Sequence, residues 1–318
     1  MEAPKTLQEA VRFFADDENC RGFMVRLRWT DGKVRCPHCG SDDVAYLPNA
    51  RVYKCYQKHP RQKFSLKVGT IFEDSPIGLD KWLPVMWMLV NCKNGISSWE
   101  IHRAIGVTQK SAWFMLQRAR LAMQDEVSGG KLGGQVEVDE TYIGGKARNM
   151  HKSVKARKLE GKGGGSVGKI GVQGFLQRGG KVKATVIQDA TFGTLVPNVQ
   201  DNIEKGSHVI TDEWKAYFGL RADYVHSTIN HAEAYVSGQI HTNGIENFWA
   251  LLKRSLGGTY VAVEPFHLFR YVDEQAFRYN HRYDLHDGIR FIAVMKQIVG
   301  RRLTYKELTG KEEETEAF

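Results

Sequence analysis

The motif CPHCG at residues 36–40 is the feature that most constrains this chain, because two thiolates two residues apart can bind one metal ion. Such a pair needs further ligands, and Cys55 and His59 follow at a spacing that can close a tetrahedral site. Sulfur and imidazole ligands favour zinc over magnesium. His38 is an alternative ligand, but it points the wrong way if Cys36 and Cys39 both bind. We therefore predict a structural zinc site in a small β-rich module.

Composition and charge limit the class of protein. The chain has 318 residues, of which 42% are hydrophobic and 25% charged, so it should fold, and it is longer than one average domain. Lysine and arginine outnumber the acids, which gives a formal charge of +9. That charge is expected for a protein that meets a polyanion, although many basic proteins bind no nucleic acid.

The amino-terminal segment and the cysteine count predict the compartment. Residues 1–20 lack the basic start, apolar run and cleavage site of a signal peptide. The chain has no uncharged apolar stretch of about 18 residues, so we expect no membrane span. An odd number of cysteines, five, favours buried thiols and metal ligands over disulfides. We expect a cytoplasmic protein.

Changes in hydrophobic period divide the chain into four regions. Residues 1–75 contain an amino-terminal helix and the β-rich cysteine module, and residues 76–130 have helical periodicity. Residues 131–283 alternate apolar strands with helices, which predicts a mixed α/β domain. Residues 284–318 form a helical tail whose polar end should fray.

The helical region contains a candidate helix-turn-helix. Its two helices are separated at Gly106, and Thr108 is a plausible N-cap for the second. Lys110 and Arg118 on the second helix would then be available to a DNA major groove. A plain helical hairpin within a core is the alternative.

A basic, glycine-rich segment spans residues 146–169. Clustered cations on a flexible loop gain from releasing the counterions of DNA, so we expect the loop to bind the phosphate backbone. A merely solvated loop is the alternative. The residues concerned are Lys146, Arg148, Lys152, Lys155, Arg157 and Lys158.

Three acids occupy positions suited to a metal site. Strand alternation places Glu137 and Asp139 on one face and Glu140 on the other. Asp212 ends a second apolar strand, and Glu246 lies on a helix. Lys253 follows Glu246 by two helical turns and shares its face. Carboxylates suit Mg²⁺, and two such ions can stabilise the attacking and leaving oxygens of a displacement at phosphorus.

These residues resemble a known family. The phrases CPHCG, QKFSLKVGTIFEDS, VEVDETYIGGK, VITDEWKAY and HTNGIENFWALLKR are similar to those of the DDE transposases of bacterial insertion sequences. Within that family, the chain looks most like the zinc-ribbon-bearing branch with an ISXO-like catalytic domain. The similarity spans nearly the whole chain.

The resemblance implies a ribonuclease H-like core in residues 131–283, preceded by a zinc ribbon and a helix-turn-helix. It implies that two Mg²⁺ (or Mn²⁺) ions bound by Asp139, Asp212 and Glu246 cleave double-stranded DNA at transposon ends and transfer the 3′-hydroxyl into target DNA. Lys253 and Arg254 would bind phosphate. The resemblance also implies a homo-oligomer that pairs two transposon ends. It implies that the protein acts in the bacterial cytoplasm, at the nucleoid.

Two departures from the family and two rival functions stay open. His59 stands where the ribbon usually has a fourth cysteine. Some members use asparagine as the third ligand, so Asn243, on the same helical face as Glu246, is an alternative to it. The rival functions are a DNA nuclease or resolvase on the same core, and a catalytically silent DNA-binding protein derived from a transposase.

Overall fold

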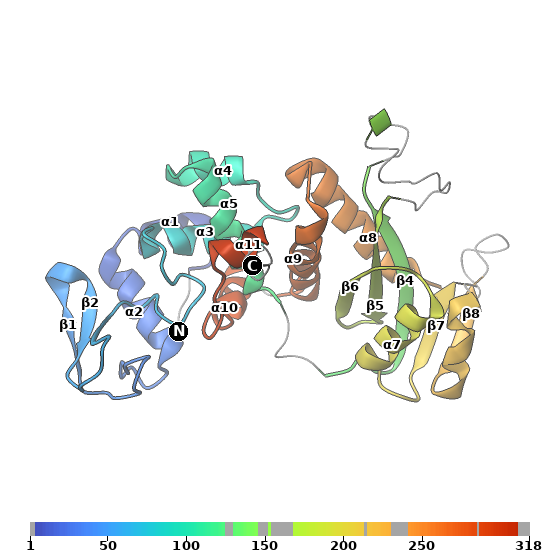
Figure 1. Ribbon diagram of the computed structural model, residues 1–318, viewed down its shortest axis with the longest axis horizontal. Helices are drawn as coiled ribbons and strands as arrows, with labels where there is room; N and C mark the ends of the chain where they lie inside the picture. The colour runs from blue at the N-terminus through green and yellow to red at the C-terminus, as the bar shows by residue number, and fades with distance from the viewer. Residues whose placement is uncertain are drawn as a thin grey trace, which may run out of the picture. The chain divides into compact units, whose positions relative to one another are not determined.

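The computed structural model describes most of the chain, and the described residues fall into two compact units (Figure 1). Unit 1 combines residues 1–124 with 283–318, and unit 2 comprises residues 125–282. Lys152 apart, the predicted cations of the basic loop lie outside the described residues. The structure describes residues 4–124, 130–145, 152–153, 168–212, 215–229, 241–284 and 286–310.

Unit 1 begins with two helices where the sequence predicted one. Helix α1 (Leu7–Phe14) ends before Asp16, whose side chain accepts a hydrogen bond of 2.7 Å from the backbone N–H of Glu18. Asp16 thereby caps the start of α2 (Asp17–Arg28). An aspartate that caps an amino terminus satisfies a backbone donor that the helix itself leaves unpaired, so the break occurs there.

The β-rich module is a three-stranded antiparallel sheet in the order β1-β2-β3. Strand β1 (Val44–Leu47) pairs with β2 (Val52–Cys55), and β2 pairs with β3 (Lys63–Phe64). The expected β structure of this region is confirmed.

Three helices follow: α3 (Leu79–Asn91), α4 (Ser98–Ile105) and α5 (Gln109–Leu121). Gly106 ends α4 in the left-handed conformation, with φ of 65°, which glycine adopts without steric cost. The hydroxyl of Thr108 accepts a hydrogen bond of 3.1 Å from the N–H of Ser111 at the start of α5. The predicted break and N-cap are therefore both present.

The carboxyl-terminal tail packs into unit 1. Phe291 of helix α10 (Asp287–Met295) contacts the rings of Phe14, Phe23 and Trp87. Helix α11 (Tyr305–Thr309) follows, and Leu308 within it is fully buried. Backbone hydrogen bonds also join residues 69–71 to residues 298–300. The tail therefore completes the core of the amino-terminal region.

Unit 2 is built on a mixed five-stranded sheet with the order β6-β5-β4-β7-β8. The antiparallel strands are β4 (Gln135–Ile143), β5 (Ile170–Gln177) and β6 (Val182–Ile187). Strands β7 (His208–Asp212) and β8 (Val225–Ile229) continue the sheet from β4 in parallel. The sequence predicted four of these strands and missed β8.

Helices cover both faces of this sheet. One face packs against α7 (Phe192–Asn202) and the 3₁₀ segment η3 (Lys215–Ala222), with Val138 and Phe175 in the shared core. The other face packs against α8 (Asn243–Ser255) and α9 (Leu268–Asn280). Among the described residues, no helix is long and apolar enough to span a membrane. Unit 2 is thus a three-layer α/β domain.

Candidate functional site

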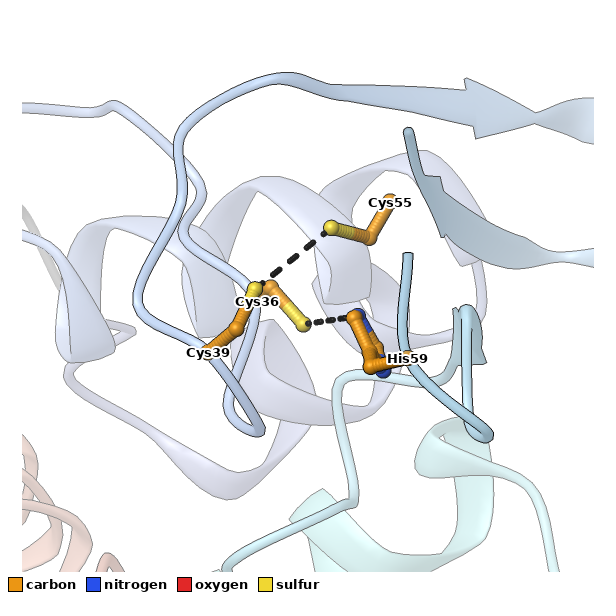
Figure 2. A group of neighbouring side chains, drawn as sticks. All are labelled: Cys36, Cys39, Cys55 and His59. Atoms are coloured by element: carbon orange, nitrogen blue, oxygen red, sulfur yellow. Dashed lines mark hydrogen bonds between the residues drawn. The ribbon is translucent and has the colours of Figure 1, made fainter. Parts of the chain in front are cut away.

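The cysteine and histidine ligands gather at one point of unit 1 (Figure 2). The ligand atoms of Cys36, Cys39, Cys55 and His59 all lie within 4.8 Å of one another. The Sγ atoms of Cys39 and Cys55 are 3.7 Å apart, and Cys36 Sγ lies 3.5 Å from His59 Nε2. A tetrahedral zinc ion with ordinary bond lengths requires about 3.7 Å between sulfurs and about 3.5 Å from sulfur to nitrogen. The residues therefore fit zinc.

His59, and not His38, completes this group. Burial raises the pKa of the Cys36 thiol, but hydrogen bonds from the backbone N–H groups of His38 and Cys39 outweigh burial, so the pKa lies below its ordinary value. The CPHCG turn thus stabilises a thiolate through its backbone. Burial, helped by the neighbouring thiols, raises the pKa of Cys55 to about 11, so a cation is needed to hold every sulfur as thiolate.

In unit 2, Asp139 lies in the middle of the central strand β4, and Asp212 is the last residue of the neighbouring strand β7. Strands β4 and β7 are parallel neighbours, with Glu137 opposite Ile210. Two residues further along, this register places Asp212 opposite Asp139. Carboxyl ends of parallel strands are where sheets of this kind bind ligands. The two acids therefore lie on neighbouring strands, beside the carboxyl end of β7.

Helix α8 lies across the face that carries Asp139. The indole Nε1–H of Trp249 donates a hydrogen bond of 3.0 Å to Asp139 Oδ2. Gly174 of β5 is paired with Asp139, and a Cβ there would lie 2.6 Å from the Trp249 ring. Only glycine allows the indole to approach the sheet closely enough to reach this carboxylate.

A buried ion pair fixes the start of α8 to strand β4. Glu137 is 1% exposed, and its carboxylate accepts hydrogen bonds of 3.0 Å from Arg178 Nε and from the N–H of Ile245. Arg178 also donates to the carbonyl oxygen of His241, at 2.8 Å. A Cβ at Gly244 would lie 2.8 Å from the Glu137 carboxylate. This clamp of Glu137 and Arg178 sets where α8 begins, and hence where its first turn lies.

Glu246 lies on that first turn and is exposed. Its Oε1 accepts a hydrogen bond of 3.1 Å from the hydroxyl of Thr242. Asn243, the alternative third ligand, is the first residue of α8 and is also exposed. The choice between the two residues stays a prediction.

The electrostatics of Asp139 link the three acids. Burial is the largest cause that raises the pKa of Asp139 to about 6, and the negative charges of Asp212 and Glu246 raise it further. The hydrogen bonds from the Glu140 backbone and Trp249 oppose this rise. Three anions that repel one another favour either protonation or a cation among them.

Glu140, on the opposite face of β4, is a second perturbed acid. Burial raises its pKa to about 9, and the charges of Asp139 and Asp212 add to the effect. The Tyr217 hydroxyl donates a hydrogen bond to Glu140, and Gln173 Nε2 donates to the Tyr217 oxygen at 3.0 Å. The expected split of Asp139 and Glu140 between two faces is thus present.

The carboxylates are less tightly gathered than the zinc ligands. Within the part of the chain that the structure describes, the Cys3His set is the one group of metal-ligating side chains whose ligand atoms lie within 4.8 Å. Asp139, Asp212 and Glu246 do not meet that closeness. Their shared role in holding a cation therefore stays a prediction, supported by the strand register and by the electrostatic coupling.

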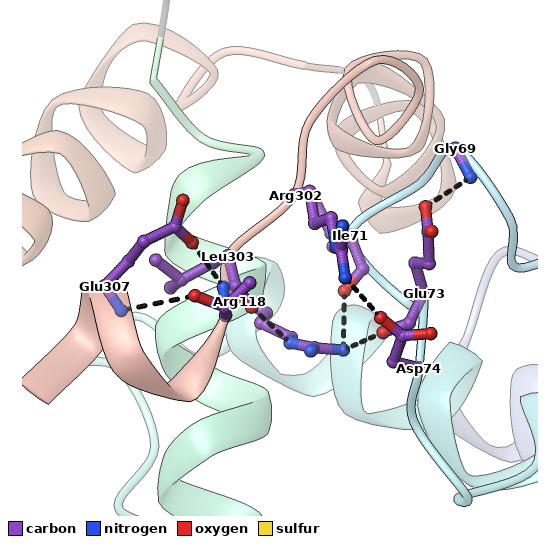
Figure 3. A network of polar contacts seen from close by, with 9 residues as sticks. Gly69, Ile71, Glu73, Asp74, Arg118, Arg302, Leu303 and Glu307 are labelled. Atoms are coloured by element: carbon purple, nitrogen blue, oxygen red, sulfur yellow. Dashed lines mark hydrogen bonds and ion pairs between the residues drawn. The ribbon is translucent and has the colours of Figure 1, made fainter. Parts of the chain in front are cut away.

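Arg118 was assigned to DNA, and the structure corrects this assignment (Figure 3). Its side chain is only 4% exposed, and its guanidinium donates hydrogen bonds to the carbonyl oxygens of Ile71, Glu73 and Leu303, at 3.3, 2.6 and 3.0 Å. Helical periodicity shows which residues share a face but not which segment will cover that face. Arg118 ties α5 to two other segments of unit 1.

The other described cations of the prediction are accessible. Lys110 lies in the first turn of α5, is exposed, and places its ammonium 5.1 Å from the centre of the Tyr305 ring. Lys253 and Arg254 are exposed on α8. All three could reach a phosphate without rearrangement of the core.

Sequence reasoning missed the clamp and the indole contact. Trp249 reads as a core residue and is indeed 4% exposed, so nothing in the sequence marks its hydrogen bond to Asp139. One feature of the sequence did point to the clamp. Glu137 is an acid in an apolar strand and shares a face with Asp139, and a buried acid needs a hydrogen-bonding or charged partner. Its partner, Arg178, lies 41 residues further along the chain.

Comparison with known proteins identifies the family. Residues 131–280 match the ISXO2-like transposase domain, and residues 15–57 match the transposase zinc-ribbon domain. The chain therefore belongs to the insertion-sequence transposases that combine a zinc ribbon with an ISXO2-like transposase domain. The match to the ribbon ends before His59, so the histidine ligand is supported by its sequence spacing and by the structure and not by the family match.

Two relatives agree with this family. The chain is 27% identical over 255 residues to an uncharacterized protein in transposable element ISH50 of Halobacterium salinarum, covering 77% of this chain and 85% of that protein. It is 28% identical over 120 residues to an uncharacterized transposase-like protein of Haemophilus influenzae, covering 37% of this chain and 94% of the relative. The first similarity extends across both units.

Proposed function

We propose that this transposase cuts DNA at transposon ends and joins the 3′-hydroxyl to target DNA, with Asp139, Asp212 and Glu246 as ligands of two Mg²⁺ or Mn²⁺ ions. The observation that carries the proposal is that the register of the parallel strands β4 and β7, continued by two residues, brings Asp212 opposite Asp139, with Glu246 close enough to raise the pKa of Asp139. A carboxylate whose pKa is raised by burial and by neighbouring charges, as that of Asp139 is, marks a candidate catalytic site.

The strand order supports a ribonuclease H-like core in unit 2. Strand β4 is central, the antiparallel pair β5 and β6 lies to one side, and the parallel strands β7 and β8 lie to the other. The first two acids come from the central strand and from its parallel neighbour, as the resemblance implies.

In this mechanism the protein supplies position and charge. The Glu137–Arg178 clamp fixes the first turn of α8, which carries Glu246, and the Trp249 indole orients one oxygen of Asp139. The carboxylate oxygens of the three acids are hard ligands suited to Mg²⁺. When bound, a pair of such ions would stabilise the attacking and leaving oxygens at phosphorus.

Exposed cations would hold the DNA. Lys253 and Arg254 extend from the face of α8 that carries Glu246, and each would neutralise a phosphate beside the bond that is cut. Helices α4 and α5 would act as a helix-turn-helix, with Lys110 in the first turn of the recognition helix, where such helices contact bases. The basic loop at 146–169 would add backbone contacts.

We propose three further properties that go with this function. A zinc ribbon beside the helix-turn-helix would contribute to recognition of double-stranded transposon ends. Two ends must meet for joining, so a homo-oligomer would form on DNA. Action on chromosomal DNA places the protein in the bacterial cytoplasm, at the nucleoid.

The test uses the full chain and a labelled duplex that carries the element's end. Asp139→Asn and Asp212→Asn should each lower Mg²⁺-dependent cleavage by about 10³-fold or more, because one ligand oxygen becomes a neutral amide, while end binding persists. Asp201→Asn, which changes an exposed acid on α7, is the matched control and should cleave normally. Parental cleavage by either site variant would overturn the assignment.

Further assays separate the rival functions and the third ligand. Joining of precleaved ends to target DNA distinguishes a transposase from a nuclease or resolvase, which would hydrolyse but never join. Wild-type end binding without any cleavage would favour a silent DNA-binding protein. Glu246→Gln should abolish cleavage and Asn243→Ala should not; the reverse result would make Asn243 the third ligand.

A further inference from the structure

One exposed stripe runs along α8 from the proposed active site. Glu246, Ala250, Lys253 and Arg254 follow one another at helical spacing and are all exposed, whereas Ile245, Phe248, Trp249 and Leu252 on the opposite side are buried. The stripe continues past the end of α8 through Gly257 and Gly258. An open surface thus leads from the carboxylates into the α8–α9 connection.

The end of this stripe is strained and apolar. A π-helical turn (Leu256–Tyr260) follows α8, and Val261 then adopts φ of 61° and ψ of −57°. This backbone conformation is rare for a β-branched residue and costs about 1–3 kcal/mol. Val261 is nevertheless 79% exposed, and Phe266 in the same connection is 56% exposed. Burial in this chain therefore does not offset the strain.

The base of the connection is firmly held. The Tyr260 hydroxyl donates a hydrogen bond to Glu274 of α9, and the rings of Tyr260 and Tyr271 pack with centroids 4.7 Å apart. Leu256 and Leu268, at the two ends of the connection, are buried. Figure 1 shows α8 and α9 joined here within unit 2. Val261 and Phe266 are thus presented to solvent from a fixed base.

We propose that Val261 and Phe266 form an apolar wedge that enters a base step of the bound DNA duplex. The proposal rests on the proposed function, which brings DNA to Glu246. Lys253 and Arg254 lie between the acids and the wedge, and they outnumber Glu264, the one acid of the connection. Proteins that kink DNA insert such apolar side chains between bases, and the added contacts offset the cost of unstacking.

The length of the stripe predicts where the wedge enters. Fifteen residues separate Glu246 from Val261, and at helical rise they span about 22 Å. A duplex lying along the stripe would advance by about six or seven base pairs over that length. The distorted step should therefore lie six or seven base pairs from the bond that is cut, inside the transposon end.

The experiment places the fluorescent base 2-aminopurine at successive positions of the end duplex and measures its emission with the full chain. Unstacking should raise emission severalfold at one position, six or seven base pairs from the cut, and at no distant one. Val261→Asp and Phe266→Ala should each lose that signal. Val225→Asp is the matched control, because Val225 is also a well-exposed valine (61%, against 79% for Val261) on β8 of the same unit, and it should keep the signal.

Val261→Gly controls for a folding defect, because glycine removes the side chain and adopts the positive φ without strain. This variant should have a Tm no lower than that of the parent and should still lose the emission signal. Asp139→Asn should keep the signal without cleavage. Position-specific cleavage by the parent without any localised emission change would refute the wedge but leave the proposed function standing. A signal that survives Val261→Asp, with altered sedimentation of the DNA-free chain, would instead make this surface a contact between copies of the chain and overturn the proposal.

Discussion

The two candidate metal centres of this protein are built in opposite ways. In unit 1, the sulfur and nitrogen ligands of Cys36, Cys39, Cys55 and His59 already lie at the separations of a tetrahedral zinc site. In unit 2, the charges of Asp212 and Glu246 help to raise the pKa of Asp139, but the three carboxylates do not gather as closely.

The roles proposed for the two centres account for this difference. Thiol groups can be neutral and can share hydrogen bonds, so the ribbon ligands approach one another at little cost. Carboxylates at neutral pH repel, and a site that must admit water and DNA phosphate keeps open positions around its cations. A closed centre stabilises a fold, whereas an open one leaves room for a reaction.

Removing zinc should have the largest effect. Structural zinc in small modules contributes about 10 kcal/mol or more to folding. Chelation, or Cys36→Ser, should therefore release zinc in elemental analysis and abolish the hydrogen-exchange protection of residues 36–64, while unit 2 keeps its protection. Cys92→Ser, which alters a cysteine outside the cluster, is the control. An unchanged zinc content in Cys36→Ser would contradict a closed zinc centre that includes Cys36.

Breaking the clamp should come next. Glu137→Gln leaves Arg178 without its charged partner at a largely buried site and should lower the free energy of unfolding by about 3 kcal/mol. Urea denaturation measures the loss. The double variant Glu137→Gln/Arg178→Gln should cost less than the sum of the single variants, since each side chain depends on the other. Additive costs would contradict the clamp.

The carboxylate site should also make stability depend on pH. The Asp139 carboxyl group is protonated more readily in the folded chain, where its pKa is about 6, than in the unfolded chain, where the pKa is near 3.8. Its contribution is therefore fully present below about pH 4 and is lost as the pH rises through 6, by about 3 kcal/mol. Urea midpoints without divalent cations measure this, and Asp139→Asn should flatten the profile between pH 4 and 6. An unchanged profile in the variant would contradict the raised pKa.

The smallest effect is expected for Lys110 of α5, and Arg118 of the same helix provides the contrast. Lys110→Ala should weaken DNA binding only severalfold and reduce its salt dependence by about one phosphate contact, with stability unchanged. Arg118→Met should do the reverse: it should lower stability by about 3 kcal/mol, because buried carbonyl oxygens lose their donor. Fluorescence anisotropy at several salt concentrations and thermal melting distinguish them. Equal loss of DNA affinity at unchanged stability would restore Arg118 as a DNA contact.

The sequence predicted the features that depend on nearby residues. Strand alternation separated Asp139 from Glu140, the CPHCG spacing located the cluster, and Gly106 with Thr108 marked the turn between α4 and α5. These features depend on backbone geometry within a few residues, so a single sequence contains them.

Features that depend on contacts between distant segments could not be predicted from the sequence. Arg118 was misassigned because its partners, Ile71 and Leu303, lie 47 and 185 residues away. Strand β8 was missed because its sequence VHSTI is short and only partly apolar, and it forms as an edge strand against β7. No periodic pattern reports which remote segment will supply a missing partner.

The return of the carboxyl-terminal tail into unit 1 has a consequence for synthesis. The rings of Phe14, Phe23 and Trp87 can pack against Phe291 only after the tail has been synthesised. The same holds for the hydrogen bond from Arg118 to the carbonyl oxygen of Leu303. On the ribosome, all of unit 2 emerges before unit 1 has its last pieces. A chain truncated after unit 2 would thus contain all five strands of the sheet but lack part of the core of unit 1.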